Sequence, residues 1–90
     1  MLIQPNQSIP LVLYFKQRQL SAYMSALTDS SLTITCETYI DKHSIVSFVN
    51  PYFRGQGSIT DIRFEKAIFT YNLDIASIQF KPGIIINQKI

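Results

Sequence analysis

His43 is the single histidine of the chain, and it lies between Asp41 and Ser44 in a polar segment. A catalytic triad needs a nucleophile, a base and an orienting acid that converge in space, so this cluster is mildly indicative of such chemistry. Polar turns collect the same residue types, and we therefore expect His43 to be an exposed loop residue. The sequence predicts no catalytic residue, and we expect the protein not to be an enzyme.

The number of available ligands argues against a structural zinc site. Tetrahedral zinc needs about four Cys or His ligands, and the 90-residue sequence contains one of each. Cys36 falls on the apolar side of an alternating segment, where a free cysteine usually packs as a small buried hydrophobe. We expect a buried thiol, no internal disulfide, no metal and no cofactor.

The acidic residues and the glycines do not form a catalytic or phosphate-binding pattern. Asp61, Arg63 and Glu65 alternate along one segment, which is typical of cross-strand charge pairing on an exposed face. Gly55 and Gly57 lack the third glycine and the following helix of a nucleotide-binding loop. Because glycine adopts positive φ at little cost, the pair predicts a bulge or sharp bend at the entrance of a strand.

Binding is better represented than catalysis. Tyr52, Phe53 and Arg54 place two aromatic rings and a guanidinium together at an expected loop or strand edge, and these residue types are frequent at interaction hot spots and at single-stranded nucleic acid sites. In the alternative interpretation, one ring plugs the end of a barrel and Arg54 is merely solvated.

A second group of interleaved aromatic and basic residues lies nearer the N-terminus. It consists of Tyr14, Lys16, Arg18 and Tyr23. The group is either a binding surface or an ordinary outer sheet face.

Strands are the elements expected to position these residues. Apolar and polar side chains alternate from about residue 10 to residue 86, the period of a strand with one face toward a core. The expected strands are residues 11–15, 20–27, 32–39, 45–49, 58–64, 67–75, 77–80 and 84–86, after an N-terminal arm of residues 1–9. Short strands with short connections predict an all-β single domain, a small six-to-seven-stranded antiparallel barrel.

Composition narrows the class of partner. Hydrophobic residues make up 47% of the chain and charged residues 16%, below the about 25% charged residues of a typical soluble domain, which leaves apolar surface for a partner. The net charge of +2 is spread along the chain, so charge alone predicts neither nucleic acid nor membrane binding. The sequence shows no signal peptide and no apolar stretch of about 20 residues, and we expect a cytoplasmic protein without a membrane span.

The order of elements resembles the PilZ domain, a small six-stranded β-barrel of bacteria. The resemblance covers about residues 10–80 and rests on strand order and on residues 28–34, 45–49, 57–60 and 71–80. Many PilZ domains are receptors for the second messenger cyclic di-GMP. The resemblance therefore implies a barrel that acts in bacterial signalling.

The PilZ members that bind cyclic di-GMP carry an Arg-x-x-x-Arg arm and an Asp/Asn-x-Ser-x-x-Gly turn. Asp29 and Ser31 match the first two positions of that turn, but Ile34 replaces its glycine, and residues 1–10 contain no arginine. Lys16 and Arg18 are the nearest basic pair. Since two guanidiniums normally grip the ligand bidentately, we do not expect this chain to bind cyclic di-GMP in the usual manner.

What the resemblance implies instead is an adaptor that acts through protein contacts in type IV pilus assembly or related machinery. Its partner would be a pilus assembly ATPase or a degenerate signalling protein. We expect docking on an exposed sheet edge or barrel face, with residues 84–90 as a candidate edge or as an internal closing strand. Two alternatives stay open: a nucleotide- or single-stranded nucleic-acid-binding barrel using residues 52–54, and a structural subunit of a larger assembly.

Overall fold

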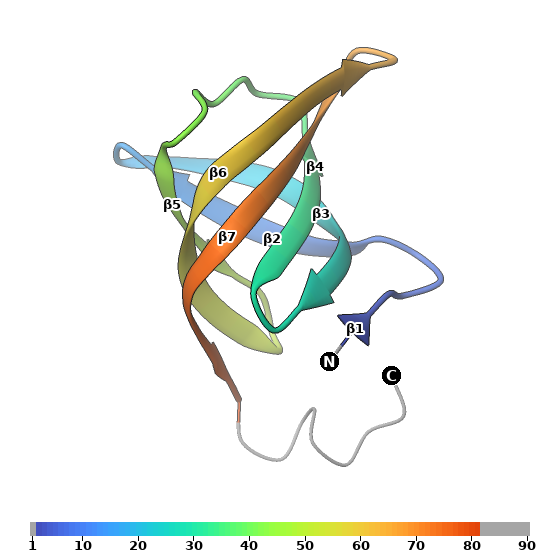
Figure 1. The fold of residues 1–90 in the computed structure, drawn as a ribbon, viewed down its shortest axis with the longest axis vertical. Coiled ribbons are helices and arrows are strands. Elements are labelled where there is room, and N and C mark those ends of the chain that lie inside the picture. The colour runs from blue at the N-terminus through green and yellow to red at the C-terminus, as the bar shows by residue number, and fades with distance from the viewer. Residues whose placement is uncertain (1, 82–90) are drawn as a thin grey trace.

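The computed structural model describes residues 2–81, and every regular element in this range is a strand (Figure 1). The strands are β1 (Leu2–Ile3), β2 (Ile9–Phe15), β3 (Arg18–Thr28), β4 (Ser31–Cys36), β5 (Ile45–Val49), β6 (Phe53–Glu65) and β7 (Ile68–Phe80). Within this range no helix is long and apolar enough to cross a membrane.

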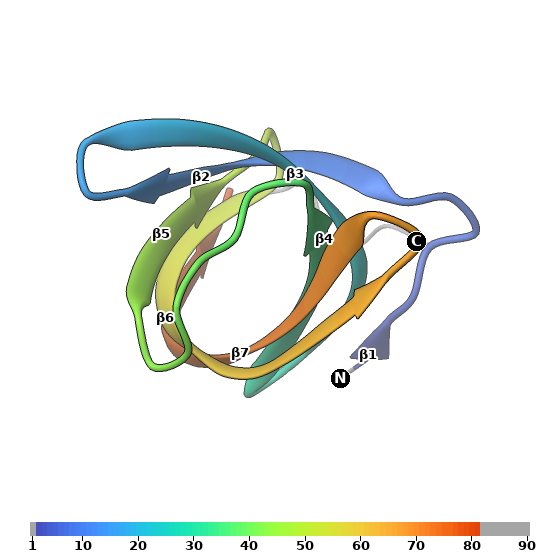
Figure 2. The same ribbon diagram turned by 90° about the horizontal axis from the view of Figure 1, so that it is seen from above.

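Six of the strands close into an antiparallel barrel. The strand order is β1-β3-β2-β5-β6-β7-β4, and an additional pairing of β3 with β4 completes the ring, which is visible in Figure 2. The seventh strand, β1, pairs with the end of β3, with Leu2 opposite Thr28. The expected all-β barrel of six to seven strands is confirmed.

The interior of the barrel holds the apolar half of each alternating strand. Burying one large apolar side chain, such as leucine, isoleucine or phenylalanine, stabilises the folded state by about 1.5–3 kcal/mol relative to leaving it exposed. Cys36 is 3% exposed and belongs to this core, as expected. The buried apolar side chains are Leu11, Leu13, Leu20, Ala22, Met24, Leu27, Leu32, Ile34, Cys36, Ile40, Val46, Phe48, Phe53, Ile59, Tyr71 and Leu73.

Several strand boundaries differ from the expectation. β2 begins at Ile9, inside the expected arm of residues 1–9, and part of that arm forms β1. β4 ends at Cys36 rather than at residue 39, and β6 begins at Phe53 rather than at residue 58. The separation of residues 67–75 from 77–80 is wrong, because β7 runs without interruption from Ile68 to Phe80, and Ala67 belongs to the turn before it. The expected strand at residues 84–86, and the candidate edge at 84–90, lie outside the described residues.

Two bulges explain why β6 and β7 were difficult to delimit. Gln56 pairs with Ser77 and Gly57 with Ile75, so Ala76 is an extra residue in β7; likewise Thr60 is extra in β6, between Ile59 and Asp61. A bulge moves the following side chains to the other face and bends the strand. The bulge expected at the two glycines is present, but it lies within the strand and its extra residue belongs to the partner strand. The expected reason is wrong, because neither Gly55 nor Gly57 has a φ in the left-handed region.

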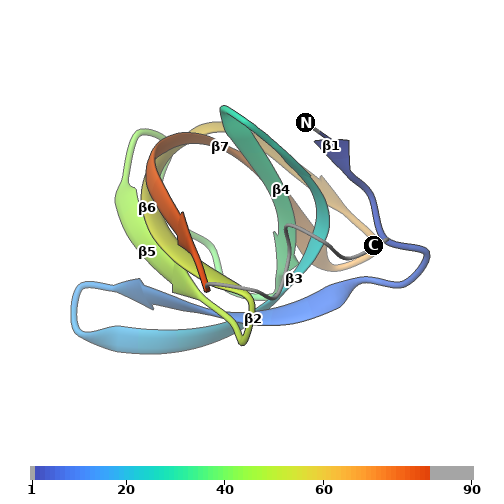
Figure 3. The same cartoon turned by 90° about the horizontal axis from the view of Figure 1, so that it is seen from below.

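The two ends of the barrel are closed differently. At one end, the segment of residues 37–44 crosses the opening (Figure 2), and its Ile40 is 1% exposed. The hydroxyl of Tyr71 donates to the Thr38 carbonyl and accepts from the Ile40 amide, both at 2.8 Å. At the other end, the connection between β5 and β6 lies beside the end of β7 (Figure 3), and the Lys81 amide donates to the Tyr52 carbonyl at 3.0 Å.

Candidate binding site

The turn between β5 and β6 is built by Asn50. Its side-chain Oδ1 accepts from the backbone amides of Tyr52 at 2.8 Å and Phe53 at 2.9 Å. The backbone N–H of Asn50 donates to the Phe53 carbonyl at 3.0 Å. Asparagine side chains commonly organise turns by bonding the backbone two or three residues ahead, and Pro51 occupies the turn that follows. The tight turn fixes which of the next residues face the core.

Of the predicted group at residues 52–54, the structure separates one ring from the other two side chains. Phe53 is 3% exposed and contacts Phe48 and Phe80 edge-on, with centroid distances of 6.0 and 5.7 Å. Phe53 is therefore the plug of the alternative interpretation. Tyr52 and Arg54 are exposed.

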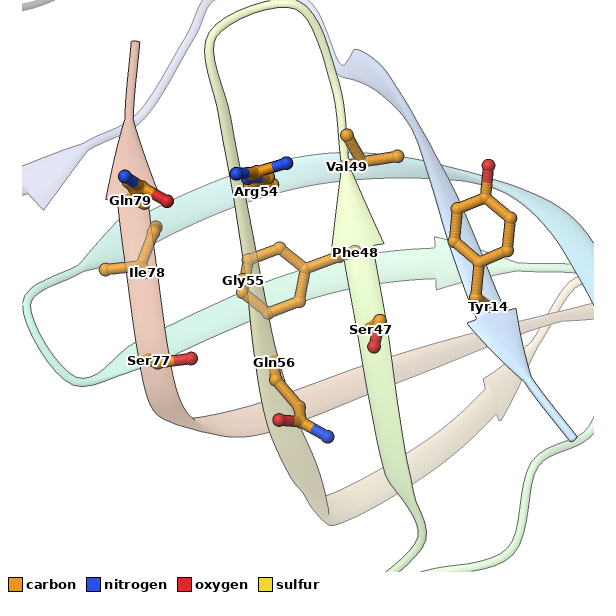
Figure 4. Close-up of a pocket in the computed structure, with 10 residues that line it drawn as sticks. All are labelled: Tyr14, Ser47, Phe48, Val49, Arg54, Gly55, Gln56, Ser77, Ile78 and Gln79. Carbon is orange, nitrogen blue, oxygen red and sulfur yellow. The ribbon is translucent and has the colours of Figure 1, made fainter. Parts of the chain in front are cut away.

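Cross-strand register gathers polar side chains around Arg54 on the outer face of the barrel (Figure 4). Arg54 lies between Val49 of β5 and Gln79 of β7. The next outward-facing row runs from Ser77 through Gln56 and Ser47 to Tyr14 of β2. Tyr14 is 47% exposed. We name Tyr14, Ser47, Val49, Arg54, Gln56, Ser77 and Gln79 the outer patch.

The outer patch surrounds an open hollow of about 500 Å³. Gly55 forms part of its floor, and the Phe48 ring reaches across to it (Figure 4). A Cβ at residue 55 would lie 2.7 Å from Phe48 Cζ and would also collide with the Ser77 carbonyl. Glycine is thus required here by close approach of the neighbouring strand and ring.

A second hollow, which we call the end hollow, adjoins the first at the end of the barrel. It has a volume of about 410 Å³, and the two hollows share Val49, Arg54 and Gln79. The end hollow is lined by Val49, Asn50, Phe53, Arg54, Gln79, Phe80 and Lys81. Among the described residues lining either hollow, none is acidic, whereas Arg54 and Lys81 are cationic.

The remaining basic candidates lie elsewhere. Lys16 occupies the turn between β2 and β3, where its Nζ lies 5.2 Å from the centroid of the Phe15 ring, and Arg18 begins β3. Both are exposed and line neither hollow. Of the N-terminal group, only Tyr14 lines a hollow; Tyr23 is exposed opposite Pro10.

The residues that match the PilZ turn lie between β3 and β4. The Thr28 hydroxyl organises this turn: its Oγ1 accepts from the amides of Ser30 and Ser31 and lies 2.8 Å from Ser31 Oγ. Asp29 is exposed. Ile34, at the position of the family's glycine, is fully buried in β4 between Met24 and Tyr71.

The side chains considered for catalysis or metal binding are not brought together. His43 is exposed, as expected, and its amide donates to the Ile59 carbonyl at 2.8 Å. Within residues 2–81, no three His, Cys, Asp or Glu side chains form a group that could hold a metal ion. Asp61 and Arg63 lie opposite Asn72 and Thr70, so neither faces a charged partner directly across that pair of strands.

Tyr14 and Arg54, which the sequence singled out as binding candidates, line a hollow, but the sequence did not point to the polar residues between and around them. Ser47, Gln56 and Gln79 belong to three different strands, and only the cross-strand register places them beside Arg54. The sequence signal for the turn at Asn50 is the pair Asn50-Pro51, because an Asn-Pro pair is typical of a turn.

No protein-family model matches the sequence, and a search of curated proteins found no match.

Proposed function

We propose that the chain is a non-catalytic binding domain that docks a partner polypeptide on the outer patch. The observation that carries this proposal is the pair of adjoining hollows around Arg54, lined by hydrogen-bonding side chains and by cations but by no acid among the described residues. Arginine and tyrosine are the residue types that most often anchor protein interfaces. An extended acidic segment complements this surface in charge and in hydrogen bonding.

The proposal extends to a cellular role as an adaptor. The closed barrel is compatible with the PilZ-like adaptor role in pilus assembly or a related machinery, with an assembly ATPase or a degenerate signalling protein as partner in the cytoplasm. Ile34 supports the ligand-free interpretation, because a buried strand residue stands where the ligand-binding turn has its glycine.

The test is selection from a random peptide library displayed on phage, followed by affinity measurement on the selected peptides. We expect enrichment of acidic peptides whose affinity falls about tenfold in Arg54→Ala, the loss typical of a charge-assisted hydrogen bond. Arg63→Ala is the matched control, because Arg63 is an exposed arginine of the same strand that lines neither hollow. Equal losses in the two variants would reduce the effect to net charge and contradict the proposal.

Two further titrations separate the alternative ligands. Cyclic di-GMP and an oligothymidine are added to the protein at near-physiological salt and again at high salt. We expect no binding of either ligand. Binding of the oligonucleotide that weakens steeply with salt, with no peptide selected, would replace the proposal by nucleic acid recognition. Binding of cyclic di-GMP that is lost in Arg18→Ala would instead make Lys16 and Arg18 a phosphate clamp.

A further inference from the structure

The end hollow contains a buried hydrogen-bond donor without a partner. Asn50 is 7% exposed, and its Nδ2 forms no hydrogen bond within the described part of the chain. The orientation of the amide is fixed, because Oδ1 already accepts from two backbone amides. A buried polar group without a partner costs roughly 1–3 kcal/mol. Because Nδ2 itself has almost no accessible surface, an acceptor oxygen in the hollow would supply the missing bond only after a small shift of the turn around Asn50.

The charges around this donor favour an anionic acceptor. Arg54 and Lys81 line the same hollow, and none of the described lining residues is acidic. Arg54 carries a planar set of donors that matches a carboxylate or phosphate bidentately. The neutral Gln79 amide adds a further donor and acceptor.

The remaining lining residues are apolar. Val49, Phe53 and Phe80 line the hollow, and the two rings are in edge-on contact at 5.7 Å. A volume of about 410 Å³ exceeds what one carboxylate fills and leaves room for a neighbouring apolar group. The hollow thus combines an anion-binding part with a hydrophobic part.

We infer that the end hollow receives a carboxylate side chain, Asp or Glu, of the docked polypeptide, next to an apolar residue that packs on Phe53 and Phe80. This inference rests on the proposed function and names the chemistry of its anchor. The carboxylate pairs with Arg54 and Lys81, and it accepts from Asn50 Nδ2 once the turn has shifted to admit it.

The test follows the side-chain amide signals of Asn50 in ¹⁵N NMR spectra. The probes are the blocked dipeptides Ac-Phe-Glu-NH₂ and Ac-Phe-Gln-NH₂, which differ in charge at one group, and inorganic phosphate. We expect the Asn50 signals to shift and saturate with the acidic dipeptide, and the neutral one to need about tenfold higher concentration. Phosphate that saturates the shift at lower concentration than the acidic dipeptide would overturn the assignment to a carboxylate.

Two variants locate the effect. Lys81→Gln should weaken the acidic dipeptide severalfold, whereas Lys42→Gln, an exposed lysine in the segment across the other end, should not. Asn50→Asp keeps an oxygen acceptor for the Tyr52 and Phe53 amides but replaces the donor by a charged oxygen, and should abolish binding while the backbone spectrum stays folded.

The outcomes distinguish this inference from the proposed function. If selected peptides bind through Arg54 but the Asn50 signals stay still and Lys81→Gln has no effect, the carboxylate anchor is overturned and docking on the outer patch stands. If the acidic dipeptide shifts the Asn50 signals and no peptide is selected, the anion-binding hollow stands and polypeptide docking falls.

Discussion

Tyr71 shows how one side chain joins the barrel wall to the segment that covers its end. The residue lies fully buried in β7, and its hydroxyl bonds both the Thr38 carbonyl and the Ile40 amide. These two backbone groups belong to the connection between β4 and β5, which has no ladder of its own. The tyrosine hydroxyl therefore satisfies backbone groups that strand pairing does not.

Tyr71→Phe should lower the free energy of unfolding by about 1–3 kcal/mol, because it removes both hydrogen bonds and leaves a buried amide without an acceptor. Urea denaturation followed by circular dichroism measures the change. Tyr39→Phe is the control, since Tyr39 is 55% exposed in the same segment. An equal effect of the two substitutions would show that the buried hydroxyl is not what stabilises the segment.

The same hydroxyl predicts a pH dependence. Burial raises the pKa of Tyr71 above its ordinary value of 10.0. A proton held more tightly in the folded state stabilises it while the pH is below 10, and this contribution is lost as the pH rises from about 10 through the folded-state pKa. Stability measured against pH should thus fall less steeply above pH 10 in Tyr71→Phe than in the wild type.

At the scale of elements, the hairpin turns use residues that their geometry does not favour. In the turn between β6 and β7, Lys66 and Ala67 have φ of 53° and 65°, and Lys16 and Gln17 in the turn between β2 and β3 have 49° and 65°. Left-handed φ at both central residues is the geometry of a type I′ turn, for which Asn-Gly is preferred. A residue other than glycine pays roughly 1–2 kcal/mol in this region.

Ala67→Gly should raise the stability by up to about 1 kcal/mol, since the relief of strain exceeds the entropy that glycine adds to the unfolded chain. Thermal and urea denaturation measure it. Ser30 is a turn residue outside the left-handed region. Ser30→Gly therefore relieves no strain and only adds conformational entropy to the unfolded chain, so this variant should be less stable than the wild type. A gain in Ser30→Gly, or a loss in Ala67→Gly, would contradict the role of φ.

Alternation predicted most strands but not the arrangement of the site. β5 occupies residues 45–49 as predicted, because its apolar residues are bounded by turn signals on both sides. β7 was divided, since the extra Ala76 interrupts the period of two. The outer patch depends on β2 pairing with β5, strands that are separated by two others in the chain, and no local pattern encodes that register.

At the scale of the whole molecule, closure of the barrel buries a thiol that can report whether the ring opens. Cys36 lies between Ala22 of β3 and Phe69 of β7 at the seam that completes the ring. Its thiol donates to the Ser21 carbonyl, with the sulfur 3.4 Å from the oxygen. The Thr38 amide of the covering segment donates to this sulfur at 3.5 Å, so a reagent reaches it if strands separate or if the segment of residues 37–44 opens.

Since the Tyr71 hydroxyl holds this segment in place, we expect labelling of Cys36 by a thiol reagent to proceed through global unfolding. The labelling rate is measured at increasing urea, under conditions where the protein refolds faster than the reagent reacts. The free energy of opening calculated from this rate should then depend on urea with the same slope as the free energy of unfolding measured at equilibrium. Rapid labelling that does not depend on urea would show that the β3–β4–β7 seam or the covering segment opens by itself. The Cys36→Ala variant gives the background for the reagent.

The extra residues Thr60 and Ala76 have a consequence for how such a barrel tolerates change. If either residue is deleted, the pairs on both sides join without a slip, and the apolar side chains of that strand fall into a perfect alternation. What is lost is the bend that wraps the β6–β7 hairpin around the barrel (Figure 1). Single-residue deletions at these two positions would make the sequence look more like a strand while making the ring harder to close. The curvature of the β6–β7 hairpin is thus carried by the two residues that break its pattern.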